Sequence, residues 1–157
     1  GLGDVYKRQL KIGAILAGAT AEDAENLYHF GMHIGVAFQL QDDLLDVYGD
    51  PEVFGKKIGG DILCNKKTYM LIKALEHADE KQQEELNRWL NAETFQPAEK
   101  IEAVTEIYNQ LNIRNVCENK MREYYTLAME SLAAVAVAED RKKELKNLVK
   151  LLMYREM

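Results

Sequence analysis

Helix-breaking residues are scarce in this chain. Pro51 and Pro97 are its only prolines, and no run of Val, Ile and Thr alternates with polar residues as a half-buried strand does. Hydrophobic residues make up 47% and charged residues 29% of the 157 positions, a balance typical of folded globular proteins. A chain of this length can bury one hydrophobic core. The sequence therefore predicts an all-α fold in one domain.

The spacing of apolar residues places successive helices along the chain. Thr20 is the predicted N-cap of a long helix that ends near Tyr48, and Asp23 would complete a weak capping box. Gly49 and Pro51 forbid its continuation. The other segments are predicted as a close-packed helix end over 10–19, a loop over 50–65, and helices over 67–77, 79–90, 97–111, 113–136 and 139–153.

Charge and cysteine content exclude several classes of protein. The net charge of −6 disfavours general nucleic-acid binding. Cys64 and Cys117 are too few for a disulfide framework and suit a reducing cytoplasm. No apolar run reaches the ~18 residues that span a bilayer, so no transmembrane segment is predicted.

The N-terminal residues differ from a natural start. The chain begins at Gly1 without Met, and residues 4–9 resemble the translation of a transposon end used in sequencing-library preparation. We therefore expect residues 1–9 to be non-native, the alternative being an ordinary polar helix start. The expected domain covers 10–157 and is a fragment that lacks its front.

An acidic face distinguishes the end of the long helix. In FQLQDDLLDVYGD, residues 38–50, a rotation of about 100° per residue places Asp42, Asp46 and Asp50 along one face. Asp43 lies beside them. Asp is a poor helix former, like charges at i,i+4 repel, and the helix C-terminus carries a negative partial charge. A bound cation would reverse this balance, and oxygen-only ligands suit Mg²⁺. The alternative is a solvated acidic face.

A lysine-rich loop follows the acidic face. GKKIGGDILCNKKT, residues 55–68, carries four lysines within twelve residues. Lysine binds phosphate as a point charge, and glycines allow the backbone to approach closely. Carboxylates, a divalent ion and lysines together would form a binding site for a diphosphate.

Other residues of the long helix leave alternatives open. Gly31 and Gly35 lie on the side of the aspartates, where small residues would either leave a groove or allow close helix packing. His29 and His33 have the i,i+4 spacing of zinc ligands, but they project away from the aspartates and lack a third ligand nearby. Surface or packing roles are the preferred interpretation of both histidines.

The two segments together resemble the second aspartate-rich region of the trans-isoprenyl diphosphate synthases, the polyprenyl synthetase family. The resemblance covers about residues 10–157 and is similar to the C-terminal half of such an enzyme. It implies an all-α isoprenoid-synthase helical bundle around a central cavity, forming a homodimer in the full-length protein. The family's first aspartate-rich motif is missing from this sequence, so the fragment alone is expected to be inactive.

The resemblance also assigns roles to particular residues. The implied Mg²⁺ ligands are Asp42, Asp43 and Asp46. Asp61 is implied to be a further carboxylate behind these ligands. The implied substrate-binding residues are Gln39, Lys56 or Lys57, Lys66 and Arg155. The three lysines would also stabilise the leaving diphosphate, and the choice between Lys56 and Lys57 depends on a register that is ambiguous by one residue.

The implied reaction is Mg²⁺-dependent, head-to-tail condensation of an allylic diphosphate with isopentenyl diphosphate in isoprenoid biosynthesis. Electrostatic stabilisation of the leaving diphosphate is the chemistry that the carboxylates and lysines suit. A class I terpene cyclase would place Ser and Glu where DDLLD has neither. A non-catalytic prenyl-synthase-like partner subunit and a helical interaction module remain as alternatives.

Overall fold

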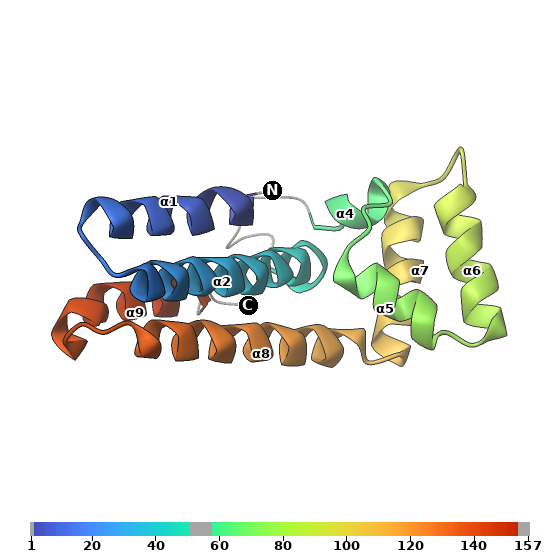
Figure 1. The fold of residues 1–157 in the computed structure, drawn as a ribbon. Coiled ribbons are helices and arrows are strands. Elements are labelled where there is room, and N and C mark those ends of the chain that lie inside the picture. The colour runs from blue at the N-terminus through green and yellow to red at the C-terminus, as the bar shows by residue number, and fades with distance from the viewer. Residues whose placement is uncertain (1, 51–57, 154–157) are drawn as a thin grey trace. The chain divides into compact units, whose positions relative to one another are not determined.

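The computed structural model describes residues 2–50 and 58–153. Within these ranges every regular element is a helix (Figure 1), and the all-α prediction is confirmed. The described helices are α1 (Leu2–Leu16), α2 (Ala21–Tyr48), α4 (Gly60–Leu63), α5 (Tyr69–His77), α6 (Glu80–Asn91), α7 (Pro97–Gln110), α8 (Ile113–Ala134) and α9 (Glu139–Met153). None of them combines the length and the hydropathy needed to cross a membrane.

The predicted helix boundaries agree with the structure to within a few residues. The long helix ends at Tyr48 as predicted. The segment 50–65, predicted as a loop, contains the short helix α4. Four residues make little more than one turn, which is too short to produce a period of apolar residues that a sequence could reveal. The segment predicted to be non-native lies within α1, apart from Gly1.

The described residues form two compact units rather than packing around one core. The first unit comprises residues 2–41 and 120–153, and the second comprises 42–50 and 58–119. Each unit therefore has its own packing, and the candidate functional residues divide between them.

The core of the first unit joins α2, α8 and α9. Its fully buried members are Phe30, Ala128, Leu132 and Val149. At Gly31 a β-carbon would lie 2.9 Å from Cδ1 of Leu10 and 3.0 Å from Cα of Lys7, both in α1. Of the two interpretations of this glycine, close helix packing is therefore correct and an open groove is wrong.

Hydrogen bonds of one hydroxyl group and two buried charged side chains hold the helix ends of the first unit. The hydroxyl of Thr20 accepts the main-chain N–H of Asp23 at 3.1 Å, which confirms the predicted N-cap. The carboxylate of Asp23 does not close a capping box but accepts the N–H of Ala136 at 2.7 Å. The buried Lys142 donates to the carbonyl of Ala133 at 2.9 Å. Both bonds secure the connection from α8 to α9.

The helices of the second unit begin at recognisable local signals. The hydroxyl of Thr68 accepts the N–H of Leu71 at 3.1 Å and caps α5. Asp79 and Gln82 form a reciprocal capping box at the start of α6. Gly59, at the start of α4, has φ 84°, and a β-carbon there would lie 2.5 Å from Cδ1 of Ile101 in α7. Only glycine fits this position, which sets α4 against α7.

Candidate functional site

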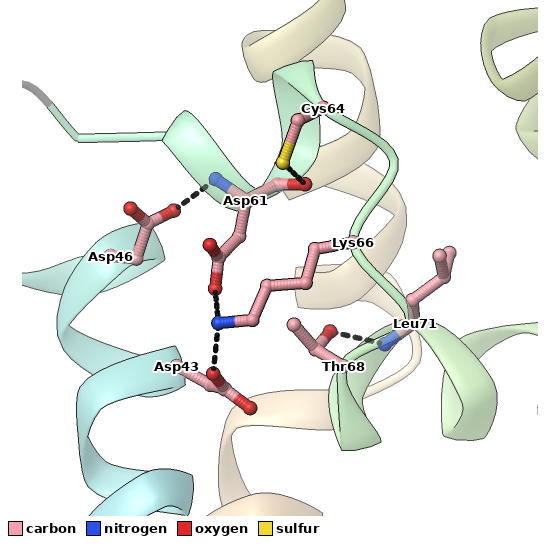
Figure 2. A network of polar contacts seen from close by, with 7 residues as sticks. All are labelled: Asp43, Asp46, Asp61, Cys64, Lys66, Thr68 and Leu71. Carbon is pink, nitrogen blue, oxygen red and sulfur yellow. Dashed lines mark hydrogen bonds and ion pairs between the residues drawn. The ribbon is translucent and has the colours of Figure 1, made fainter. Parts of the chain in front are cut away.

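Three carboxylates and one ammonium group converge within the second unit (Figure 2). Asp43 and Asp46 come from the last turns of α2, and Asp61 comes from α4. Lys66 follows α4 and points between the helix ends toward Asp43 and Asp61. Two aspartates of the acidic face and Lys66 of the lysine loop are thus parts of one polar cluster.

Lys66 bridges the two segments. Its ammonium donates to Oδ1 of Asp43 at 2.9 Å and to Oδ2 of Asp61 at 2.7 Å. The side chain of Asp43 is only 6% exposed, whereas that of Lys66 is 43% exposed and can still be reached from solvent. Burial acts to lower the pKa of Lys66, but the bonds to Asp61 and Asp43 outweigh it and raise this pKa above its ordinary value. The ammonium therefore stays charged.

Asp46 is held by the beginning of α4. Its Oδ2 accepts the N–H of Asp61 at 2.9 Å, and its carbonyl accepts the N–H of Gly59 at 2.6 Å. A β-carbon at Gly60 would lie 3.3 Å from Oδ1 of Asp46, so small residues let the backbone approach this carboxylate. Burial raises the pKa of Asp46, and the Asp61 charge adds to this rise against the opposing N–H bond. The negative charge of Asp46 is thus only partly compensated.

These contacts revise the electrostatic argument made from the sequence. A bound cation was expected to offset the unfavourable charges at the end of α2. The structure places the ammonium of Lys66 and main-chain N–H groups of α4 there. Part of the compensation is therefore internal to the chain, and it depends on a fold that local helix energetics cannot reveal.

The remaining predicted site residues have separate positions. Asp42 is half-buried on α2, in the second unit, and Gln39 is exposed on the same helix within the first unit. Lys56, Lys57 and Arg155 lie outside the described residues. Among the residues that the structure describes, no three carboxylate, imidazole or thiol side chains are grouped to hold a metal ion by themselves.

The histidine pair of α2 makes packing contacts in the first unit. Nε2 of His29 lies 3.6 Å from a carboxylate oxygen of Glu25. The rings of His29 and His33 stack at 6.2 Å, and the ring of His33 lies 6.1 Å from that of Tyr124. No three metal-ligating side chains are grouped here to hold an ion within the described chain, and the ring contacts support the packing interpretation.

Asn65 and Lys100 lie behind Lys66, and the sequence analysis did not predict a role for either residue. The ammonium of Lys100, in α7, donates to Oδ1 of Asn65 at 2.7 Å. Burial lowers the pKa of Lys100. One signal was available: Lys100 shares an i,i+4,i+7 stripe with the buried Val104 and Ile107 and so occupies a core position.

A small cavity adjoins the polar cluster. Its lining includes Asp61, Asn65, Lys66, Lys100 and Tyr108, and the rest is mainly apolar. Its free volume of about 20 Å³ is close to that of one water molecule and far below that of a prenyl diphosphate. This cavity, beside the cluster, is therefore too small to hold a diphosphate.

Comparison with known proteins identifies the family. Residues 3–111 match the sequence model of the polyprenyl synthetase family, which is more than half of the chain. The chain belongs to the polyprenyl synthetase family. The family inferred from the acidic face and the lysine loop is therefore confirmed.

Similar proteins extend the match over most of the chain. The (2E,6E)-farnesyl diphosphate synthase of Mycobacterium tuberculosis is 31% identical over 149 residues, 93% of this chain and 41% of that protein. A crystal structure of geranylgeranyl pyrophosphate synthase superposes with a TM-score of 0.86 at 34% identity, covering 97% of this chain and 47% of the other. The predicted isoprenoid-synthase helical fold is confirmed.

A second solved relative carries ligands. Geranylgeranyl pyrophosphate synthase from Corynebacterium glutamicum, complexed with isoprenyl diphosphate and magnesium, gives a TM-score of 0.79 at 31% identity. That match covers 92% of this chain and 41% of the other. The chain thus spans less than half of the length of each of these family members.

Proposed function

We propose that this chain forms part of a trans-prenyltransferase that condenses an allylic diphosphate with isopentenyl diphosphate. One observation supports the proposal most directly: the aspartates that end α2 and the lysine that follows α4 face one another in a single cluster (Figure 2). A solvated acidic face would not require a lysine from a later segment. Relatives named as farnesyl and geranylgeranyl diphosphate synthases support the same reaction class.

The carboxylates fit Mg²⁺, and we propose Asp42, Asp43 and Asp46 as its ligands, with Asp61 behind them. All four supply the hard oxygen atoms that this ion prefers. The raised pKa of Asp46 indicates a buried negative charge that a cation would stabilise. Mg²⁺ uses one or two carboxylates and completes its shell with water and phosphate oxygens, so a dense protein cage is unnecessary. When bound, it would stabilise the leaving diphosphate electrostatically.

The chain's own cations would hold the diphosphate. Two hydrogens of the Lys66 ammonium bond to Asp43 and Asp61, and its third is available to a diphosphate oxygen. The proposed further contacts are Lys56 or Lys57, Gln39 and Arg155. In the reaction the C–O bond of the allylic substrate breaks, the diphosphate leaves with the electron pair, and a C–C bond to isopentenyl diphosphate forms. The condensed carbocation then loses a proton to the departing diphosphate and forms the double bond of the product.

We also propose a homodimer for the longer protein, a cytoplasmic location, and a native domain beginning near residue 10. The free thiols of Cys64 and Cys117 are compatible with a reducing compartment. No observation favours the non-catalytic partner subunit.

Substitution of Asp42 in a longer protein that includes this region tests the proposal. Asp42→Ala should lower turnover by orders of magnitude while the circular dichroism spectrum and the unfolding midpoint stay close to wild type, because a proposed metal ligand is lost. The matched control is Asp50→Ala, which removes an exposed aspartate from beyond the helix end. Unchanged turnover of the Asp42 variant would remove the metal-ligand assignment.

The 157-residue chain permits a simpler measurement. We expect it to bind inorganic pyrophosphate in the presence of Mg²⁺, as detected by isothermal titration calorimetry, but not to condense the two substrates. Condensation by the chain alone would contradict the expected inactivity. Binding that is independent of Mg²⁺ would contradict the metal assignment.

A further inference from the structure

The turn that carries Lys66 has an unusual backbone. Asn65, between α4 and Lys66, adopts φ 53°, in the left-handed region that favours glycine. Its side chain bonds on two sides: Nδ2 donates to the carbonyl of Leu90 at 2.9 Å, and Oδ1 accepts from Lys100 at 2.7 Å. Glycine would adopt the same φ more easily, so the asparagine side chain itself has a use here.

Lys100 reaches this turn from inside the second unit. It is 1% exposed, and its ammonium lies 4.2 Å from the centre of the Phe95 ring as well as against Asn65. Burying an ammonium against an amide and an aromatic ring is costly compared with burying methionine of similar length. Stability alone does not account for a lysine at this position.

The backbone connects Asn65 directly to the polar cluster. The N–H of Lys66 donates to the carbonyl of Asp61 at 2.9 Å, and its carbonyl accepts the N–H of Thr68 at 2.8 Å. From this fixed point the side chain of Lys66 extends to Asp43 and Asp61 (Figure 2). An altered backbone at Asn65 would change the direction in which Lys66 leaves the turn.

We infer that Lys100 is a positioning residue that acts through Asn65 to aim the ammonium of Lys66 at the carboxylate cluster. The positioning follows from the contacts. Its purpose, to present a preorganised cation to a diphosphate, rests on the proposed function. A cation fixed before the ligand arrives loses little conformational entropy on binding.

Relaxation of lysine side chains by NMR tests the positioning without any ligand. The ¹³Cε order parameter of Lys66 should be higher than that of its exposed neighbour Lys67 in the wild-type chain. Lys100→Met removes the ammonium and retains the length of the side chain. Asn65→Gly removes the amide and permits the left-handed backbone. In both variants the order parameter of Lys66 should fall toward that of Lys67.

Two matched controls separate positioning from general loosening. Asn112→Gly makes the same substitution at a second left-handed asparagine, with φ 54°, at the start of α8. Lys142→Met removes the buried lysine of the first unit. Neither should change the order parameter of Lys66. An unchanged order parameter of Lys66 in Asn65→Gly would overturn the inference, and so would an equal fall of this order parameter in the two controls. Either result would count even if Lys100→Met failed to fold.

A double variant tests whether Lys100 acts through Asn65. Lys100→Met should loosen Lys66 no further when Asn65 is already glycine, because the two residues then form one pathway. Additional loosening would refute that pathway. Asn65→Asp keeps an acceptor for Lys100 but loses the donor to Leu90, so Lys66 should be more ordered than in Asn65→Gly and less ordered than in the wild type.

Pyrophosphate binding tests the purpose separately. In the presence of Mg²⁺, Lys100→Met and Asn65→Gly should each raise the Kd for inorganic pyrophosphate about tenfold. This change corresponds to a loss of about 1.4 kcal/mol of binding free energy. The controls should bind as the wild type does. If the wild-type chain bound no pyrophosphate, the proposed function of this chain would fail, while the relaxation data would still decide the positioning. Wild-type affinity in both variants would refute the purpose.

Discussion

The two compact units of this chain use charged side chains differently. In the first unit, Asp23 and Lys142 bond to main-chain atoms of the α8–α9 connection, and Lys142 also pairs with the nearby Glu139. In the second unit, Lys66 and Lys100 bond to side chains of other segments. A charge bonded to the backbone closes a turn and has a fixed partner. A charge bonded to side chains can exchange or share its partners with a ligand.

The difference indicates where function resides. Asp23 and Lys142 complete the fold of the first unit, whereas Lys66 and Lys100 lie in and behind a carboxylate cluster that is exposed on the side of Lys66. Substitution of Asp23 or Lys142 should therefore affect stability alone, and substitution of Lys66 or Lys100 should affect both stability and ligand binding.

The largest expected effect compares two glycines. Gly18 and Gly59 have φ of 78° and 84°, but a β-carbon at Gly18 would meet nothing within 4 Å. Gly18→Ala should lower the free energy of unfolding by roughly 1–2 kcal/mol through backbone strain alone. Gly59→Ala should lower it by about 2–4 kcal/mol, because the clash with Ile101 adds to the strain. Urea denaturation measures both, and equal costs would show that α4 can move away from α7.

An alkaline loss of stability is the next largest effect and arises in the second unit. Burial raises the pKa of Cys117 to about 12 from its ordinary value of 9.0. The folded thiol therefore holds its proton where the unfolded one has lost it. Stability should be constant below about pH 9 and should fall as the pH rises toward 12. At pH 10.5 the loss from Cys117 would be about 2 kcal/mol.

Tyr48 should add to this alkaline loss, since burial raises its pKa to about 12 from 10.0. Unfolding midpoints between pH 8 and 10.5 measure the slope of stability against pH, and Cys117→Ala should make this slope shallower.

In the first unit, hydrogen bonds from lysine lower the pKa of the exposed Glu25 and Glu139. Their small contribution is present above about pH 4.5 and is lost only in acid. A steeper alkaline slope in Cys117→Ala would contradict the assignment.

Removal of Asp23 tests the backbone-bonded charges. Asp23→Ala should cost about 1–2 kcal/mol because the N–H of Ala136 loses its acceptor and α2 loses part of its N-terminal support. Asp23→Asn keeps an acceptor and should cost less. Thermal unfolding measures the change, and pyrophosphate binding should be unaffected in both variants. Weaker pyrophosphate binding would remove the functional distinction between the units.

The smallest expected change in stability gives the sharpest comparison. Lys142→Met and Lys66→Met should each cost about 1 kcal/mol, because each removes hydrogen bonds made by one ammonium group. Only Lys66→Met should weaken binding of Mg²⁺ and pyrophosphate in calorimetry. Loss of binding in the Lys142 variant would show that the two units respond together.

Local signals in the sequence were sufficient for most of the fold. Helix caps at Thr20, Thr68 and Asp79 act over three residues, and the period of apolar side chains acts over one or two turns. For this reason the boundaries of the long helices could be predicted. The acidic face at the end of α2 and the lysine loop were also visible, because each is a continuous segment.

The sequence alone therefore determined the longer helices, their ends and the two charged segments that identify the family. Only the tertiary structure decided which charges meet. Asp23 bonds across 113 positions and Lys100 across 35, and the packing that brings each pair together leaves no periodic trace in the sequence. A helix is stabilised by bonds between near neighbours along the chain, whereas a polar cluster depends on where separate helices are packed.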